Sequence, residues 1–416
     1  MIGKSALIVV FGFILSFSVY QLRLNKALLS ATDTFNYYYM KTLVHEEALN
    51  AMNFGINKIW QHEITDDNFT VTSNGCTSNV SIYETCLDTV LLKVKTWNYG
   101  FVQDHYDRFH ESFKFEDSVF AYFSYRMPVS RYFWFTNNEG SVYWVSGDTV
   151  WGPTHTNSIL RTYGRPVFYG KVTAYQGISP SPTHPYSRAK YYGGWEIGVR
   201  VEIPTDMSHL IQAATTGNGP APMNTKSLYN LETTFEFLYD GRVVRTVGAD
   251  SPDTVLVSDI APTGVVHSTA DVRVKGALNG QLTIYSEDDI WIDDDIVYAS
   301  DPISNPACDD FLGLVSGDNV IITDNDANNS NVYIQACMMA IGGSFVAENY
   351  QSRPVAGNLD VTGSIVQKDR GPVGTFGWWG ITSGFYKQYR FDTRCASQSP
   401  PSYPFVRALS LVSWWE

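Results

Sequence analysis

The chain has 416 residues, of which only 17% are charged and 14% are aromatic. With 42 Asp and Glu against 29 Lys and Arg its formal charge is −13, and no basic stripe is present, which excludes nucleic acid as a partner. The length predicts two or three domains, and the abundance of Tyr, Val, Thr, Gly and Asn is typical of strands and turns.

The N-terminal segment carries the clearest pattern. Residues 5–22 contain no charge, Lys4 precedes them and Arg23 follows. Such a run is just long enough to cross a bilayer as a helix. No A-x-A cleavage site follows it, so a retained helix fits better than a removable signal peptide. The apolar side chains of this run that we assign to the helix are Ala6, Leu7, Ile8, Val9, Val10, Phe11, Phe13, Ile14 and Leu15.

The helical pattern continues beyond the apolar run. Phe35, Tyr39 and Leu43 recur at helical spacing, and no proline occurs before Pro128. We therefore predict one hydrophobic and amphipathic helix within residues 1–60. Roughly fifty helical residues would extend about 75 Å at 1.5 Å per residue.

Gly3 followed by Ser5-Ala6-Leu7-Ile8-Val9-Val10 resembles the Gly-x-x-Ala-Leu-Ile stretch of PilX-type, type IV pilin-like proteins. This resemblance implies an assembly helix that lies in the inner membrane before assembly and then packs against copies of itself in a filament. The major pilins carry a Glu at the fifth position of the mature chain, whereas the apolar run here contains no carboxylate. A plain single-span membrane anchor is the alternative.

The rest of the chain predicts an α+β fold that is mostly β. Residues 61–140 are expected to form a pilin-like α/β or β region. From residue 141, short apolar pairs recur between turns of Gly, Asp and Asn. The interval between them is about eight to twelve residues over 265–297, where the pattern is clearest. This spacing fits a β-sandwich or a parallel β-solenoid (β-helix), and the very short turns favour the solenoid over 141–173 and 255–400.

Residues 174–254 interrupt this rhythm with Pro-rich loops and are interpreted as an insertion. Within them, Asp240-Gly241 predicts a hairpin between Thr233–Phe237 and Val243–Val247. Residues 401–416 form a C-terminal arm, in which Trp414 and Trp415 are expected to dock on the body or on a neighbouring subunit.

Four stretches are similar to large bacterial surface proteins that combine a pilin-like N-terminus with an uncharacterised C-terminal domain. The resemblance implies a β-helical C-terminal domain and assigns no catalytic residue. The stretches are 147–157, 276–284, 311–320 and 363–375.

The five cysteines lack CxxC or Cys/His zinc spacing, so we expect no metal and no cofactor. In an exported chain Cys76, Cys86, Cys308 and Cys337 are candidates for disulfides, and Cys395 is left over.

The residues that could carry catalysis form no catalytic pattern. The carboxylates of 288–289, 293–295 and 309–310 are interpreted as solvated turn residues, and His155 as a hydrogen-bonding turn residue. We therefore expect no enzyme. The sequence predicts a structural subunit of an extracellular type IV pilus-like filament at the cell surface. The alternatives are a membrane-anchored adhesin that binds glycans or surfaces through exposed aromatics and, less favoured, a β-helical polysaccharide-degrading enzyme.

Overall fold

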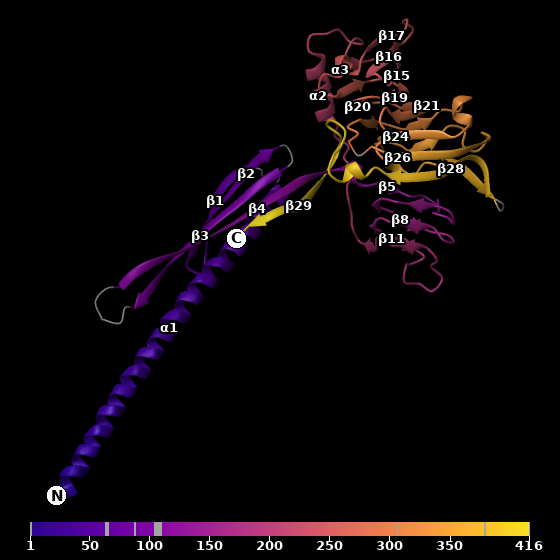
Figure 1. The fold of residues 1–416 in the computed structure, drawn as a ribbon. Coiled ribbons are helices and arrows are strands. Elements are labelled where there is room, and N and C mark those ends of the chain that lie inside the picture. Colours follow the sequence, from indigo (N-terminus) through magenta and orange to yellow (C-terminus); the bar gives the residue numbers. More distant parts are fainter. Residues whose placement is uncertain are drawn as a thin grey trace. The chain divides into compact units, whose positions relative to one another are not determined.

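The computed structural model describes residues 2–62, 66–86, 89–103, 110–305, 307–377 and 380–415 (Figure 1). The chain divides into two compact units. Unit 1 comprises Met1–Arg126 and Arg407–Glu416, and unit 2 comprises Met127–Val406. Unit 2 is therefore inserted, along the sequence, between two segments of unit 1, and two chain crossings join the units.

Unit 1 is a long helix followed by an antiparallel sheet. The helix α1 (Ile2–His62) confirms the predicted continuous helix. The sheet has the order β1-β2-β3-β4-β29. Residues 401–416, expected as an arm, contain its last strand. The strands are β1 (Asp67–Ser73), β2 (Cys76–Cys86), β3 (Thr89–Gln103), β4 (His110–Pro128) and β29 (Phe405–Trp415).

One face of this sheet forms the core of unit 1. Because side chains alternate between the faces of a strand, alternate residues are buried over the middle of β2, β3 and β4. The second half of α1 covers that face, and Trp414 of β29 packs against the same cluster. The buried strand residues are Val80, Ile82, Val90, Leu92, Val94, Val119, Ala121 and Phe123.

Unit 2 is built from many short strands. Those before its first helix are β5 (Trp134–Asn138), β6 (Thr149–Val150), β7 (Thr154–Thr156), β8 (Ile159–Arg161), β9 (Val167–Phe168), β10 (Val172–Ala174), β11 (Gly177–Ser179), β12 (Lys190–Tyr191) and β13 (Trp195–Ile197). Its helices are α2 (Ser208–Asn218) and α3 (Val257–Ile260), and its 3-10 turns are η1 (Val129–Arg131), η2 (Ala327–Asn329) and η3 (Thr393–Ala396). The later strands are β14 (Leu228–Tyr229), β15 (Thr233–Phe237), β16 (Arg242–Val247), β17 (Asp253–Leu256), β18 (Val265–Ser268), β19 (Val272–Leu278), β20 (Gln281–Ser286), β21 (Ile290–Tyr298), β22 (Phe311–Ser316), β23 (Val320–Ile322), β24 (Val332–Ala340), β25 (Phe345–Ala347), β26 (Val355–Asp369), β27 (Gly374–Gly377) and β28 (Gly380–Phe391).

Most of these strands belong to one large, mixed and mostly parallel sheet of 22 strands. In one series of parallel pairings, β18 pairs with β20, β20 with β22, β22 with β24 and β24 with β26. A second series runs from β15 through β19 and β21 to β23 and β25. The body thus confirms the coarse prediction of a long helix followed by a β-rich region.

The order of strands in space differs from their order in the sequence. The first strand of unit 2, β5, pairs with the late strand β26 through Ile365↔Trp134. From there β7, β10 and β13 continue the parallel series. Residues 134–197 therefore extend one end of the series, and β14 lies beside β18.

Residues 174–254, expected as an insertion, hold β11 to β16 and the helix α2. The predicted hairpin is confirmed, because β15 and β16 pair antiparallel with Phe237↔Val243 next to the turn. Gly241 in that turn has a φ of 82°, a left-handed conformation that glycine adopts without strain.

Candidate assembly helix and the adjoining pocket

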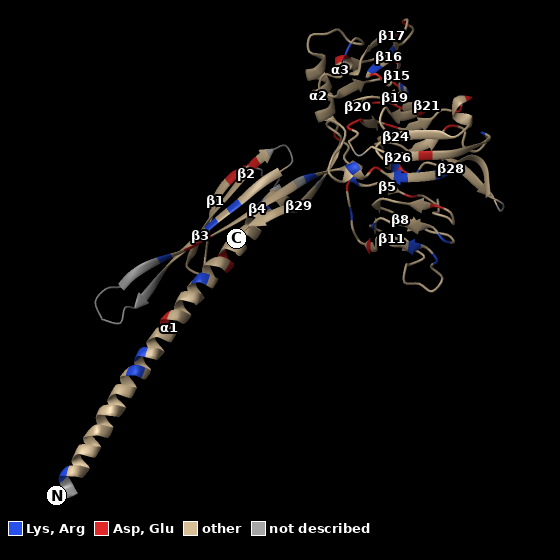
Figure 2. Cartoon of the chain, viewed as in Figure 1, with Lys and Arg blue, Asp and Glu red and all other residues tan. Residues whose placement is uncertain are grey.

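The first part of α1 has no cover from the rest of the described chain. Figure 2 shows this part of the helix almost without charged residues. The side chains are strongly exposed, with Ile8 at 72% and Phe13 at 76%. By length and composition, α1 is the one helix in the described chain that is long and apolar enough to cross a membrane. The exposed residues include all that the sequence analysis assigned to this segment, namely Ala6, Leu7, Ile8, Val9, Val10, Phe11, Phe13, Ile14 and Leu15.

The second part of α1 is held by unit 1. Val44, Ala48 and Ala51 are buried at helical spacing, which places them on one side of the helix. At Gly55 the helix comes so near the sheet that an added Cβ would lie 2.6 Å from the Leu92 side chain. A larger residue there would have to displace the buried Leu92 side chain, so glycine eases the close approach of helix and sheet.

Polar contacts fix the orientation of this packed part. His45 Nδ1 lies 2.7 Å from Asp117 Oδ2 on β4. The amide of Asn74 donates to the buried carboxylate of Glu47 at 2.5 Å. Both contacts come from one turn of α1 and reach two different segments, β4 and the residue that follows β1, so they oppose rotation of the helix on the sheet.

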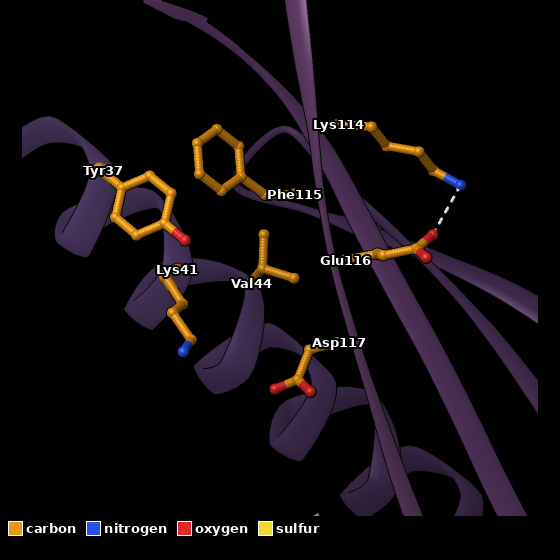
Figure 3. Close-up of a pocket in the computed structure, with 7 residues that line it drawn as sticks. All are labelled: Tyr37, Lys41, Val44, Lys114, Phe115, Glu116 and Asp117. Carbon is orange, nitrogen blue, oxygen red and sulfur yellow. Dashed lines mark ion pairs between the residues drawn. The ribbon is translucent and has the colours of Figure 1, made fainter.

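A pocket of 490 Å³ lies where α1 passes from its exposed part to its packed part. Figure 3 shows Tyr37, Lys41 and Val44 on the helix side and the β4 residues opposite. The rings of Tyr37 and Phe115 lie 5.6 Å apart. The pocket therefore has an aromatic lip next to charged groups. The lining residues from β4 are Lys114, Phe115, Glu116 and Asp117.

The carboxylate of Glu116 is paired with Lys114 at 2.8 Å. This hydrogen bond lowers the pKa of Glu116, so the carboxylate stays ionised at neutral pH. The pocket thus combines a partly apolar lining with one ion pair at its edge.

The cysteines are distributed over both units. Cys76 is a buried free thiol in β2, and the side chain of Cys86 lies outside the described part of the chain. Cys308, Cys337 and Cys395 are buried free thiols of unit 2. Cys76, Cys308 and Cys337 are unlinked in this structure, and the disulfides suggested for them stay predictions. The sulfur of Cys337 faces that of Cys395, the residue that was left over.

Two predictions on polar residues need correction. Asp310 was expected to be solvated, but it is buried and accepts hydrogen bonds from the backbone of Gly280 and Ser300. His155 was expected in a turn, but it lies in β7 with its ring 2.7 Å from Thr173 Oγ1. Burial lowers the pKa of His155 to about 4, so it is neutral at physiological pH. Among the described residues, no group of three or more His, Cys, Asp or Glu is placed to hold a metal ion.

A buried cluster of charges in unit 2 was not predicted. Arg370 donates to Glu139 at 2.6 Å, and both side chains are essentially inaccessible. The guanidinium of Arg370 also lies 4.2 Å from the centre of the Trp144 ring. Lys387 Nζ lies 3.9 Å from Asp148 Oδ2 in the same region. We call Glu139, Asp148, Arg370 and Lys387 the buried charge cluster.

Sequence reasoning missed the cluster because its members come from distant segments, Glu139 before β6 and Arg370 after β26. Two cations face two carboxylates in the cluster, so its formal charges cancel. We therefore interpret the cluster as charge pairing in the interior of unit 2.

The described residues define a β-rich chain led by one helix of membrane-spanning length and composition. No family model matches the chain, and no curated protein is similar to it in sequence. Among solved structures, it is similar to the competence-associated pilin ComZ from Thermus thermophilus. The TM-score is 0.32 and the identity 9%, over 84% of this chain and 86% of that chain. A likeness at this level carries no weight for function, which rests on the residues described above.

Proposed function

We propose that this chain is a structural subunit of an extracellular type IV pilus-like filament and has no enzymatic activity. The observation that carries the proposal is the division of α1 into an exposed apolar part and a part locked onto its own sheet. A helix that is apolar all round is stable only when lipid or other protein covers it. The inner membrane provides that cover before assembly, and copies of the same helix provide it in the filament.

The energetics favour such an exchange of partners. Fully burying one Leu, Ile or Phe side chain contributes about 1.5–3 kcal/mol relative to water. Phe11, Phe13 and Ile14 are each more than half exposed, so leaving them in water would be costly. The pocket beside Tyr37 adds a lateral contact point, since an aromatic or aliphatic side chain of a neighbouring helix fits its apolar lip.

The parallel strands of unit 2 support a second part of the proposal, that the body is a β-solenoid. Its strands pair with segments one turn further along the chain, as in β20 with β22 and β22 with β24. In a solenoid each coil packs only on its neighbours, which makes a stiff body suited to the outside of a filament.

An anchored adhesin is the second candidate, and an exposed aromatic stack is the surface with which it would bind a glycan. Trp151, Tyr169 and Tyr192 are 55%, 42% and 67% exposed. Their ring centres are 3.9 Å and 5.2 Å apart along the stack. Because the rings cover one another's faces, the stack presents mainly ring edges, whereas a sugar ring packs on a flat aromatic face. The stack therefore supports internal stiffness more than glycan binding.

The experiment compares sheared extracellular material and membranes from cells that carry the full-length chain or its variants. Replacing Phe11 and Phe13 by Ala keeps the segment uncharged, so it still enters the membrane, but removes packing area between helices. We expect filaments that contain the chain, detected by electron microscopy and peptide identification. The double variant with Ala at positions 11 and 13 should form no filaments, while its amount in the membrane is unchanged.

The control variant is Tyr239→Ala, which removes a 67% exposed ring of unit 2 and should leave filaments intact. Filaments that persist in the double variant, or after deletion of residues 1–25, would refute assembly through α1. A wild-type chain found only in membranes would favour the anchored adhesin instead.

A further inference from the structure

Two buried thiols of unit 2 face each other. Cys337 belongs to β24 and Cys395 to η3, and their sulfur atoms are 3.4 Å apart. Both residues are 0% exposed. They come from segments 58 residues apart in the sequence, so only the fold brings them together.

The remaining thiols are held in other contacts. Cys308 donates to the carbonyl of Ser300 at 2.8 Å, and the guanidinium of Arg394 lies 3.4 Å from its sulfur. Cys76 belongs to unit 1, where its sulfur accepts from Asn98 at 3.4 Å. Cys337 and Cys395 are therefore the pair with direct sulfur contact among the described cysteines.

We propose that Cys337 and Cys395 form a disulfide that fastens η3 to the parallel strands of unit 2. The inference rests on the proposed function in one respect, since an exported chain matures in an oxidising compartment. A disulfide needs the sulfurs at about 2.05 Å, so the gap closes by little more than an ångström. The single 3-10 turn of η3, which is four residues long, can supply that shift without moving a ladder strand.

The oxidant is a disulfide-bearing protein or small molecule. One protein thiolate attacks a sulfur of the oxidant's disulfide and displaces one thiol. The second protein thiolate then attacks the mixed disulfide and displaces the other thiol. The two protein thiols lose two protons and two electrons, and the oxidant's disulfide is reduced to two thiols.

The environment of the pair sets when this reaction takes place. The hydrogen bond between the two sulfurs, together with burial, raises the pKa of Cys395. Because the thiolate is the reacting form, the folded thiol pair reacts slowly with oxidants, and burial keeps reductants from the finished bond. Oxidation therefore precedes the final packing of η3, and the finished bond is shielded from reduction.

The position of Cys395 gives the bond a mechanical role. After η3 the chain runs to the second crossing between the units, which follows Val406. Weaker contacts also hold this stretch, such as Thr283 Oγ1 donating to the carbonyl of Pro401 at 2.6 Å. When β29 is pulled, the force acts on these contacts one after another. The disulfide is the covalent link at the end of that series.

The test uses the full-length chain exported by its host and purified in detergent without reductant. Free thiols are alkylated in denaturant, and the unreduced digest is analysed by mass spectrometry. We expect one linked peptide pair that joins Cys337 to Cys395, with Cys308 alkylated. Alkylated Cys337 and Cys395, or a link from either to another cysteine, would overturn the proposal.

Two variants separate the bond from local packing. Cys395→Ser should leave Cys337 open to alkylation and make residues 396–406 several-fold more sensitive to limited proteolysis. Cys308→Ser, which alters a neighbouring thiol, should change neither. Equal proteolysis of Cys395→Ser and wild type would refute the fastening role.

A second arm keeps failure of this proposal distinct from failure of the proposed function. The reduced, denatured chain is refolded with oxidised glutathione, so that no export is required. Formation of the same link there supports the disulfide even if no filament exists. Its absence there overturns the disulfide whatever the location of the chain.

Discussion

Lys387 makes a sharp test of the buried charge cluster, because its ammonium group is held in a poorly hydrated site. Its side chain is 13% exposed, and Asp148 at 3.9 Å is its ion-pair partner. Burial, helped by the nearby charge of Arg370, lowers the pKa of Lys387 from 10.5 to about 8, although Asp148 and Glu139 oppose the shift. The folded protein therefore binds this proton less tightly than the unfolded chain does.

The direction of the pH effect follows from that difference. Below pH 8 both states hold the proton, so Lys387 adds no pH dependence. Between about pH 8 and 10.5 the unfolded chain binds more protons than the folded one, so stability rises with pH. At about 1.4 kcal/mol for each pKa unit, the gain across this window is about 3 kcal/mol.

The perturbation is Lys387→Met, which keeps the length of the side chain and removes the charge. At pH 7 the free energy of unfolding of this variant should exceed that of wild type. The loss of the ion pair between Lys387 and Asp148 reduces this excess. The difference between the two proteins should then shrink by about 3 kcal/mol as the pH rises to 10.5, because wild-type Lys387 becomes neutral in the folded state.

The assay is urea unfolding at a series of pH values, followed by tryptophan fluorescence. Trp134 and Trp144 are buried beside the cluster, so they contribute to the signal. The matched control is Lys171→Met, since Lys171 pairs with Glu196 but is 57% exposed. A difference between Lys387→Met and wild type that stays constant with pH would refute the reasoning.

Two further variants test packing in unit 2. Gly170→Ala would place a Cβ 2.1 Å from the Gly152 carbonyl oxygen, and overpacking of this kind costs about 1–3 kcal/mol. We therefore expect a lower urea midpoint, and an unchanged midpoint would contradict the close approach. Glu139→Gln leaves the buried Arg370 without its counter-charge and should cost about 3–5 kcal/mol in thermal or urea unfolding, whereas replacing both residues by Leu should recover most of that loss.

Local features were within reach of the sequence. The helix is determined by neighbouring residues, since uncharged apolar residues and the lack of proline leave few other conformations. The β15–β16 hairpin is similarly local, because Asp240-Gly241 meets the conformational needs of its turn. Both predictions depend on contacts within a few residues, which periodicity and turn chemistry report directly.

Long-range features could not be predicted from the sequence. Glu139 and Arg370 are 231 residues apart, and a single sequence contains no signal that pairs them. The same holds for Cys337 and Cys395. The sequence likewise contains no signal that β5 pairs with β26, which places the beginning of unit 2 beside its end.

One overlooked pattern did carry long-range information. The triplets Val150-Trp151-Gly152, Phe168-Tyr169-Gly170 and Tyr191-Tyr192-Gly193 each place an apolar residue, an aromatic ring and a glycine in succession. In the structure the first members pair in parallel, the rings stack, and an added Cβ on Gly170 or Gly193 would collide with the backbone of the preceding triplet. The repeat was not predicted because the three triplets are unequally spaced and therefore show no fixed period. Since stacked coils tolerate loops of different length, the chemistry at each corner is a better guide to such a body than a fixed period.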